Sequence, residues 1–470
     1  SNLGLPLIAK EFPKINRKSE FENFQDDTNW EWNRWSHFAI AYLPHMIAHT
    51  ILFNLANKYL SQIIVPYIVI IYSLIISSIF FTPWLVCLSL LQGTFVFFIA
   101  NLVRKRSAVW LSAIPSLYYV LHYTTALASD PFLVLIFVSY TILSYISYNL
   151  EAIDGKIREE DNNSWKRYIR MMFYTFYLPY MISLVMTYPE FERRIRERNS
   201  KPRQWNKIIL FIIRIIFWWL FIEFILHFFY FEAILYDINY AANLPKNEFV
   251  SLGMAIGTFF HMKYVVIFGF PSIFAHLDNM QPFDGPICIA RVTLYSKMWR
   301  YFDRGLYSFF KTYIFVPICA PSFSIGRRII GVLISFAFVL LWHGCYYHNV
   351  VWIILNILGL FVEYTGKAIY MIDSVRKWRE ENLSDIAFRR ILAWLQIIPF
   401  IFGIYSNFYF LGGSQVGYLF VQRIWNEETL TLRYPLFILL TLGYFYTQLT
   451  IEIDRRIEIR QENKEIKMKN

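Results

Sequence analysis

The chain has 470 residues, of which 56% are hydrophobic, 20% aromatic and only 17% charged. A water-soluble fold of that composition would lack the polar side chains needed to cover its surface. The net charge of +11 does not indicate nucleic-acid binding, because the basic residues lie between apolar segments and form no single stripe. The composition therefore predicts an all-α polytopic membrane protein, whose basic loops are retained on the cytosolic side.

Apolar runs of about 20 residues, long enough to cross a hydrocarbon core, recur along most of the chain. In chain order, the predicted helices are 34–57, 62–81, 84–103, 108–127, 131–150, 207–234, 250–274, 329–346, 349–365, 391–410 and 432–452. This pattern predicts about ten or eleven transmembrane helices. Two further segments, 171–188 with Pro179 and 289–318 with six charged residues among aromatics, are predicted to be re-entrant or interfacial helices.

Charge in the connecting segments predicts the orientation. If the two incomplete segments do not cross, the Lys/Arg-rich connectors all fall on one side; they are 104–106, 151–170, 193–207, 327–328, 366–390 and 454–470. The loops around 235–249 and 411–431 are poor in Lys and Arg. The basic side, including the charged tail 454–470, is therefore predicted to be cytosolic. Segment 1–33 is predicted to be cytosolic or interfacial, and 1–470 a single membrane-embedded domain.

The four cysteines, Cys87, Cys288, Cys319 and Cys345, form no CxxC motif and no Cys/His spacing of a zinc site. Neither a disulfide framework nor a zinc site is expected. Residues 1–30 mix acidic and basic side chains without an apolar core followed by a small-residue cleavage site, so no removable signal peptide is predicted.

An imidazole lies inside the apolar segment FAFVLLWHG, which covers Phe336–Gly344. His343 follows Arg328 by 15 residues, or about 22 Å along a straight helix. Ionisable side chains at membrane depth are costly, which makes this histidine a candidate for function. A histidine satisfied by a neighbouring carbonyl or hydroxyl is an equally good interpretation.

A carboxylate between two arginines marks the segment KMWRYFDRG, Lys297–Gly305. On spacing alone, the preferred interpretation is an interfacial helix in which Asp303 pairs with Arg300 or Lys311. From the residues alone, Arg300 and Arg304 are expected to snorkel to lipid headgroups.

Taken together, these segments resemble the membrane-bound O-acyltransferase superfamily, whose signature is an intramembrane histidine in a Trp-His-Gly-type context with an upstream polar residue. Within it, the resemblance narrows to the Hedgehog acyltransferase branch. The matching residues are Met298–Leu306, Tyr313–Pro317, Phe336–Gly344, Asn356 with Glu363, Asn407 with Phe410–Gly413, Val416-Gly417, and Lys263–Pro271 with Leu277-Asp278. The resemblance is dense over 255–420, the expected catalytic core, and the separation 343 − 303 = 40 is that of the family. Ile318–Ser322 departs from the family's glycine-rich turn.

The resemblance implies helices around a central reaction channel, with His343 and Asp303 as catalytic residues. The implied supporting and substrate-binding residues are Trp299, Arg300, Trp342, Asn356 and Asn407. It implies palmitoyl-CoA as acyl donor, the N-terminal cysteine of a secreted Hedgehog-type protein as acceptor, and the endoplasmic reticulum or Golgi membrane as location. Cys288 matches a haem-ligating cysteine of this branch, so it is a tentative axial ligand of a structural haem b; a small buried apolar cysteine is the alternative.

Within that expectation, His343 is the general base that removes a proton from the acceptor amine. Asp303 is expected to orient the ring, hold the amine or handle a second proton, and the sequence leaves these roles open. No serine or cysteine lies in a nucleophile-elbow context, which favours direct transfer. The alternatives are a lipid O-acyltransferase acting on a glycerolipid or sterol, a catalytically silent relative, and a transporter, which the lack of internal symmetry disfavours.

Overall fold

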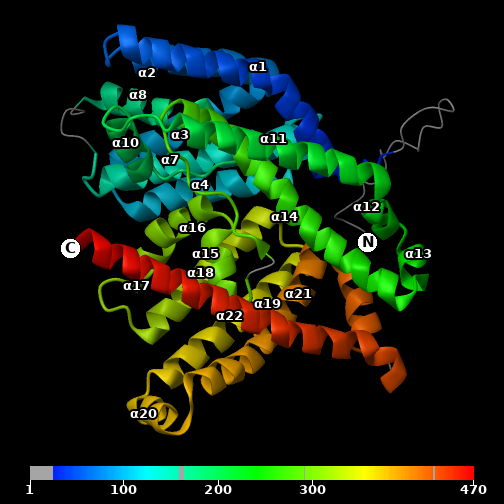
Figure 1. The fold of residues 1–470 in the computed structure, drawn as a ribbon. Helices are drawn as coiled ribbons and strands as arrows, with labels where there is room; N and C mark the ends of the chain where they lie inside the picture. The colour runs from blue at the N-terminus through cyan, green and yellow to red at the C-terminus, as the bar shows by residue number, and fades with distance from the viewer. Residues whose placement is uncertain (1–24, 158–162, 290–291, 427–428, 470) are drawn as a thin grey trace, which may run out of the picture.

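The computed structural model describes residues 25–157, 163–289, 292–426 and 429–469. Within these ranges every regular element is a helix (Figure 1). The elements of the first half are α1 (Trp30–Tyr59), α2 (Val65–Phe80), α3 (Thr82–Val103), α4 (Arg106–His122), α5 (Thr124–Leu127), α6 (Pro131–Leu133), η1 (Val134–Val138), α7 (Ser139–Ile153), α8 (Ser164–Thr175), α9 (Leu178–Met181), α10 (Tyr188–Glu197), α11 (Trp205–Phe228), α12 (Phe231–Tyr236) and α13 (Ile238–Asn243). Those of the second half are α14 (Lys246–Leu277), α15 (Tyr295–Tyr301), α16 (Arg304–Phe310), η4 (Lys311–Phe315), α17 (Val316–Cys319), α18 (Ile325–His343), α19 (Tyr347–Tyr370), α20 (Asp373–Asn382), α21 (Asp385–Ile424), η5 (Leu430–Arg433) and α22 (Tyr434–Lys469).

Nine helices of the described residues are long and apolar enough to cross a membrane: α1, α3, the continuous run α6–η1–α7, α11, α14, α18, α19, α21 and the first 30 residues of α22. The all-α polytopic fold predicted from the sequence is confirmed. Two predicted spans, 62–81 and 108–127, contain the shorter helices α2 of 16 residues and α4 of 17 residues. Both carry prolines, at the first turn of α2 and inside α4.

The ends of the helices gather at two faces of the molecule. In Figure 1, α8, α10, α20 and the end of α22 lie on the left, whereas α12 and α13 lie on the right. The left-hand elements belong to the Lys/Arg-rich segments, so we call this the basic face. We call the other the opposite face.

The two incomplete segments consist of short helices, and their re-entrant or interfacial placement stays a prediction. Segment 171–188 divides into α8 and α9 before Pro179, and 289–318 contains four short helices in place of one span. Both pack against α7 through one serine: Ser147 Oγ accepts the backbone N–H of Tyr188 at 2.8 Å and lies 2.9 Å from the Tyr313 hydroxyl. These contacts connect the start of α10 and the π-helical turn η4 to α7.

Candidate active site

His343 is the last residue of α18, and local geometry fixes where its ring lies. Gly344 ends the helix with φ 87° and ψ 140°, a conformation that favours glycine. The Asn349 side chain donates to the carbonyl oxygens of His343 at 2.7 Å and Gly344 at 2.9 Å, which caps the turn. The half-buried imidazole stands edge-on to Trp352 and to Phe410, each with ring centroids 5.2 Å away. Helices α18, α19 and α21 therefore enclose it in an aromatic box.

Asp303 is the N-cap of α16, at the corner between α15 and α16. Its Oδ1 accepts the backbone N–H of Leu306 at 2.8 Å. None of the ion pairs found among the described residues includes Asp303, so the structure contradicts the interpretation in which it pairs with Arg300 or Lys311. The carboxyl group lies outside the nine spans, and burial raises the pKa of Asp303 to about 6. A carboxyl group near neutrality is suited to proton transfer.

A narrow cleft lies beside Asp303, and one of its lining residues, Phe283, has its ring 5.9 Å from the guanidinium of Arg194 in α10, at the basic face. Its walls are Leu184–Met186, Phe268, Pro282–Gly285 and Phe302–Gly305. Asp284 is mostly exposed, and its carboxylate forms an ion pair with Arg304, with Oδ2 3.3 Å from Nη1. Gly305 is required where the cleft narrows, because a Cβ there would lie 1.9 Å from the carbonyl oxygen of Val185. Asp303 thus lies at the inner end of a cleft whose outer rim carries Arg304.

Aromatic rings connect the surroundings of Asp303 with His343. Phe302 stacks on Phe260 at 5.5 Å, and Phe260 contacts Phe410, which contacts His343. On the other side, Tyr140 stands edge-on to Trp342 at 5.6 Å and lies within electrostatic range of Asp303. The two polar residues therefore border one aromatic-lined region, although no hydrogen bond joins them among the described residues.

This arrangement can be compared with known proteins. Residues 94–370 match the model of the MBOAT, membrane-bound O-acyltransferase family. That match covers more than half of the chain. The chain belongs to the membrane-bound O-acyltransferase family. The resemblance drawn from the sequence is confirmed, and with it the acyltransferase class.

Named relatives of this acyltransferase include two protein-cysteine N-palmitoyltransferases. Rasp of Drosophila melanogaster is 30% identical over 319 residues, which are 67% of this chain and 63% of Rasp. HHAT of Mus musculus is 26% identical over 445 residues, 91% of this chain and 88% of HHAT. The membrane-bound O-acyltransferase GUP1 of Candida tropicalis is 24% identical over 263 residues, 50% of this chain and 44% of GUP1. The match to Rasp therefore spans less than two thirds of that relative.

Three of the other predicted site residues of the acyltransferase lie together. Trp299 Nε1 donates to Asn356 Oδ1 at 2.8 Å, and Asn356 Nδ2 donates to the Trp352 carbonyl at 2.8 Å. Since Trp352 contacts the His343 ring, this network connects α15 to the aromatic box. Trp342 packs on Tyr140 beside it. Arg300 and Asn407 are instead exposed, Arg300 near the Tyr301 and Tyr307 rings.

An ion pair that the sequence analysis missed lies beside His343. Lys263 Nζ in α14 is 2.5 Å from Glu31 Oε2 in the first turn of α1, and the Tyr264 hydroxyl donates to Glu31 Oε1 at 2.9 Å. Lys263 is 4% exposed, and Glu31 is within electrostatic range of His343. The sequence feature that could have indicated this pair is Lys263 itself, a charged residue inside the apolar run 250–274. Its partner lies in segment 1–33, of which residues 1–24 lie outside the described residues.

Cys288, the tentative haem ligand, is exposed in the loop before α15 and lies within electrostatic range of Tyr446. The described residues contain no group of three or more His, Cys, Asp or Glu side chains that could hold a metal ion. The exposed thiol contradicts the alternative of a small buried apolar cysteine. The haem itself stays a prediction.

Proposed function

We propose that this acyltransferase transfers a palmitoyl group from palmitoyl-CoA to the N-terminal cysteine amine of a secreted, Hedgehog-type signalling protein, with His343 as general base. The observation that carries the proposal is the position of His343. It lies in an aromatic box. A chain of ring contacts connects this box to Phe302 beside Asp303, and Glu31 of the Glu31–Lys263 pair is within electrostatic range of His343. The names of Rasp and HHAT support the same reaction class and acceptor residue.

In the proposed reaction, the acceptor nitrogen attacks the thioester carbonyl carbon. The N–C bond forms, the C–S bond breaks, and the thiolate of coenzyme A leaves. His343 takes the proton that the nitrogen loses and returns it to the leaving sulfur. An α-amine has a pKa of about 8, so a fraction of it is already neutral. Direct transfer needs no nucleophile from the enzyme.

Asp303 is proposed as the second proton-handling group. The Leu306 and Gly305 backbone N–H groups donate to its carboxyl group, which orients it. The cleft beside it suits the donor, because Arg304 at its rim offers a charge-assisted contact to a phosphate. Exposed Arg300 is a second candidate for that contact.

The proposed setting is the endoplasmic reticulum or Golgi membrane, with the basic face and the charged tail in the cytosol. Coenzyme A would then approach from the basic face, and a secreted acceptor from the opposite, lumenal face. Membrane lipids surround the protein, and no nucleic acid is expected as a partner.

The test uses purified protein with palmitoyl-CoA and a panel of N-terminal-cysteine peptides, compared with lysolipids and sterols. Acylation of the peptides is expected. Activity on lipids alone would overturn the proposal in favour of a lipid O-acyltransferase. Flux through proteoliposomes that depends on His343 without acyl-CoA turnover would instead indicate a transporter.

Cys288 is proposed as the axial ligand of a structural haem b, on the strength of its exposed thiol and of the resemblance. Its thiolate would hold the iron, and the haem would supply no step of acyl transfer. Absorbance of the purified protein in the Soret region tests this directly. Loss of that band in Cys288→Ser is expected, whereas an unchanged band would assign the haem to another residue.

A further inference from the structure

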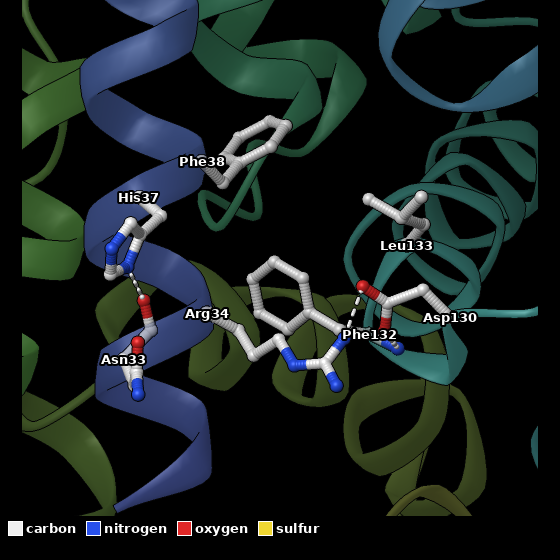
Figure 2. Close-up of a pocket in the computed structure, with 7 residues that line it drawn as sticks. All are labelled: Asn33, Arg34, His37, Phe38, Asp130, Phe132 and Leu133. Atoms are coloured by element: carbon white, nitrogen blue, oxygen red, sulfur yellow. Dashed lines mark hydrogen bonds and ion pairs between the residues drawn. The ribbon is translucent and has the colours of Figure 1, made fainter. Parts of the chain in front are cut away.

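An open groove of about 470 Å³ lies between the first turns of α1 and the start of α6 (Figure 2). It is lined by Asn33, Arg34, His37, Phe38, Asp130, Phe132 and Leu133. The rings of Phe38 and Phe132 contact each other at 6.2 Å and form an apolar wall. The described site residues of the reaction are not among those that line this groove.

One ion pair crosses the groove. Arg34 Nη1 lies 2.6 Å from Asp130 Oδ2, as Figure 2 shows. Asp130 is fixed, because its Oδ1 also accepts the Phe132 backbone N–H and caps α6. Among the described residues, Asp130 is the partner found for Arg34, whose side chain is 54% exposed. Since guanidinium carries five N–H donors, Arg34 keeps donors for a further ligand.

Both walls of the groove continue into the catalytic region. On α1, Glu31 precedes Arg34 by three residues, a helical spacing that places their Cβ atoms about 6 Å apart. Glu31 is in turn within electrostatic range of His343. On the other wall, the helical run that starts after Asp130 carries Tyr140, which packs on Trp342 beside His343. Ten residues separate Asp130 from Tyr140, or about 15 Å of helix.

We infer that this groove binds the acceptor chain beyond its N-terminal cysteine, and that Arg34 is a specificity-determining residue that donates to the acceptor's backbone carbonyl or carboxylate oxygens. The inference rests on the proposed function. An extended chain spans about 3.3 Å per residue, so the helical rise of about 15 Å from Asp130 to Tyr140 equals about five residues, and Arg34 is expected to contact the acceptor several residues after its cysteine. A shorter acceptor ends before it reaches Arg34.

The charges of the groove suit a peptide better than the acyl donor. Arg34 and Asp130 cancel each other, so the groove offers no net positive charge to the phosphates of coenzyme A. The cleft at Asp303, with Arg304 at its rim, lies at the basic face, whereas the groove lies beside the first turn of α1. The apolar wall of the groove can contact side chains of an extended peptide, and the exposed Arg34 guanidinium can donate to its backbone carbonyl oxygens.

The test compares wild type with Arg34→Gln on two acceptors, a three-residue and a ten-residue N-terminal-cysteine peptide. For the long peptide, KM is expected to rise about tenfold, the loss of one charge-assisted hydrogen bond. The kcat, the KM for palmitoyl-CoA and all constants for the short peptide are expected to stay unchanged. Arg376→Gln is the matched control, because Arg376 forms an exposed ion pair with Asp373 at 2.7 Å in α20 at the basic face.

The outcomes distinguish failure of the proposed function from failure of the groove inference. If wild type acylates no N-terminal-cysteine peptide, the proposed function fails and the groove loses its occupant. If wild type acylates both peptides and Arg34→Gln leaves the KM of the long peptide unchanged, the groove inference alone is overturned. If Arg34→Gln instead changes the phospholipid that co-purifies, with KM unchanged, the groove binds a lipid headgroup and the inference is also overturned.

Discussion

At the scale of single residues, His343 is where the proposed chemistry is concentrated. Replacing His343 with Ala removes the general base, and the rate of acyl transfer is expected to fall by about 10² to 10⁴-fold. The ring packs on Trp352 and Phe410, so folding is checked by size exclusion and thermal unfolding. His343→Gln serves as the matched control for the lost volume. Unchanged acylation by either variant would show that another group takes the proton.

Asp303 provides a prediction about pH and stability. Burial raises its pKa from 3.8 to about 6, so between these values the unfolded chain has lost the proton that the folded chain keeps. Stability should therefore fall as pH rises from about 4 to about 6, by at most about 3 kcal/mol. Asp303→Asn cannot ionise and caps α16 equally well.

The measurement is Tm against pH from 4.5 to 7.5 for both proteins in detergent. Asp303→Asn is expected to lack this decline and to be the more stable protein at pH 7, while losing acyl transfer. Parallel Tm curves would mean that the Asp303 carboxyl titrates at its ordinary pKa in the folded protein.

At the scale of elements, the corner between α15 and α16 depends on Gly305. A Cβ at this position would meet the Val185 carbonyl oxygen at 1.9 Å, and backbone atoms yield little. Gly305→Ala is expected to destabilise the protein by more than about 3 kcal/mol, and expression and Tm measure it. Gly326→Ala in α18, where a Cβ meets nothing within 4 Å, is the control and is expected to be neutral or slightly stabilising. Equal Tm values for both variants would contradict the predicted clash.

Individual elements show which features of the fold and the site could be predicted from the sequence alone. The apolar runs predicted the long helices, and the scarcity of ionisable groups among apolar residues made His343 a candidate. The catalytic role of Asp303 was predicted from the family resemblance, because its own segment carries several other charges. Trp299 and Asn356 were each predicted from the family resemblance, but the hydrogen bond between them, which joins residues 57 apart in sequence, was found only in the structure. Glu31 and Lys263 are 232 residues apart in sequence, and their contact exists only after α1 packs on α14. Periodicity within one helix carries no information on such a pairing.

At the scale of the whole molecule, the proposed reaction requires access from both faces. Donor and acceptor differ in charge and origin, and the structure separates the Asp303 cleft, which lies at the basic face, from the groove beside α1. If the two approaches are separate, saturation with palmitoyl-CoA should leave the binding of an acceptor peptide intact. Both substrates then bind before reaction, in keeping with direct transfer in place of an acyl-enzyme.

The orientation of the molecule is testable by labelling in sealed microsomes, whose outer surface is cytosolic. Lys377→Cys lies in α20 at the basic face, and Asn239→Cys lies in α13 at the opposite face. With the native exposed cysteines replaced, an impermeant maleimide is expected to label Lys377→Cys in intact vesicles and Asn239→Cys only after permeabilisation. The reason is the retention of Lys/Arg-rich loops in the cytosol. Labelling in the reverse order would place the Asp303 cleft on the lumenal side, away from cytosolic acyl-CoA, and the route proposed for the donor would then be wrong.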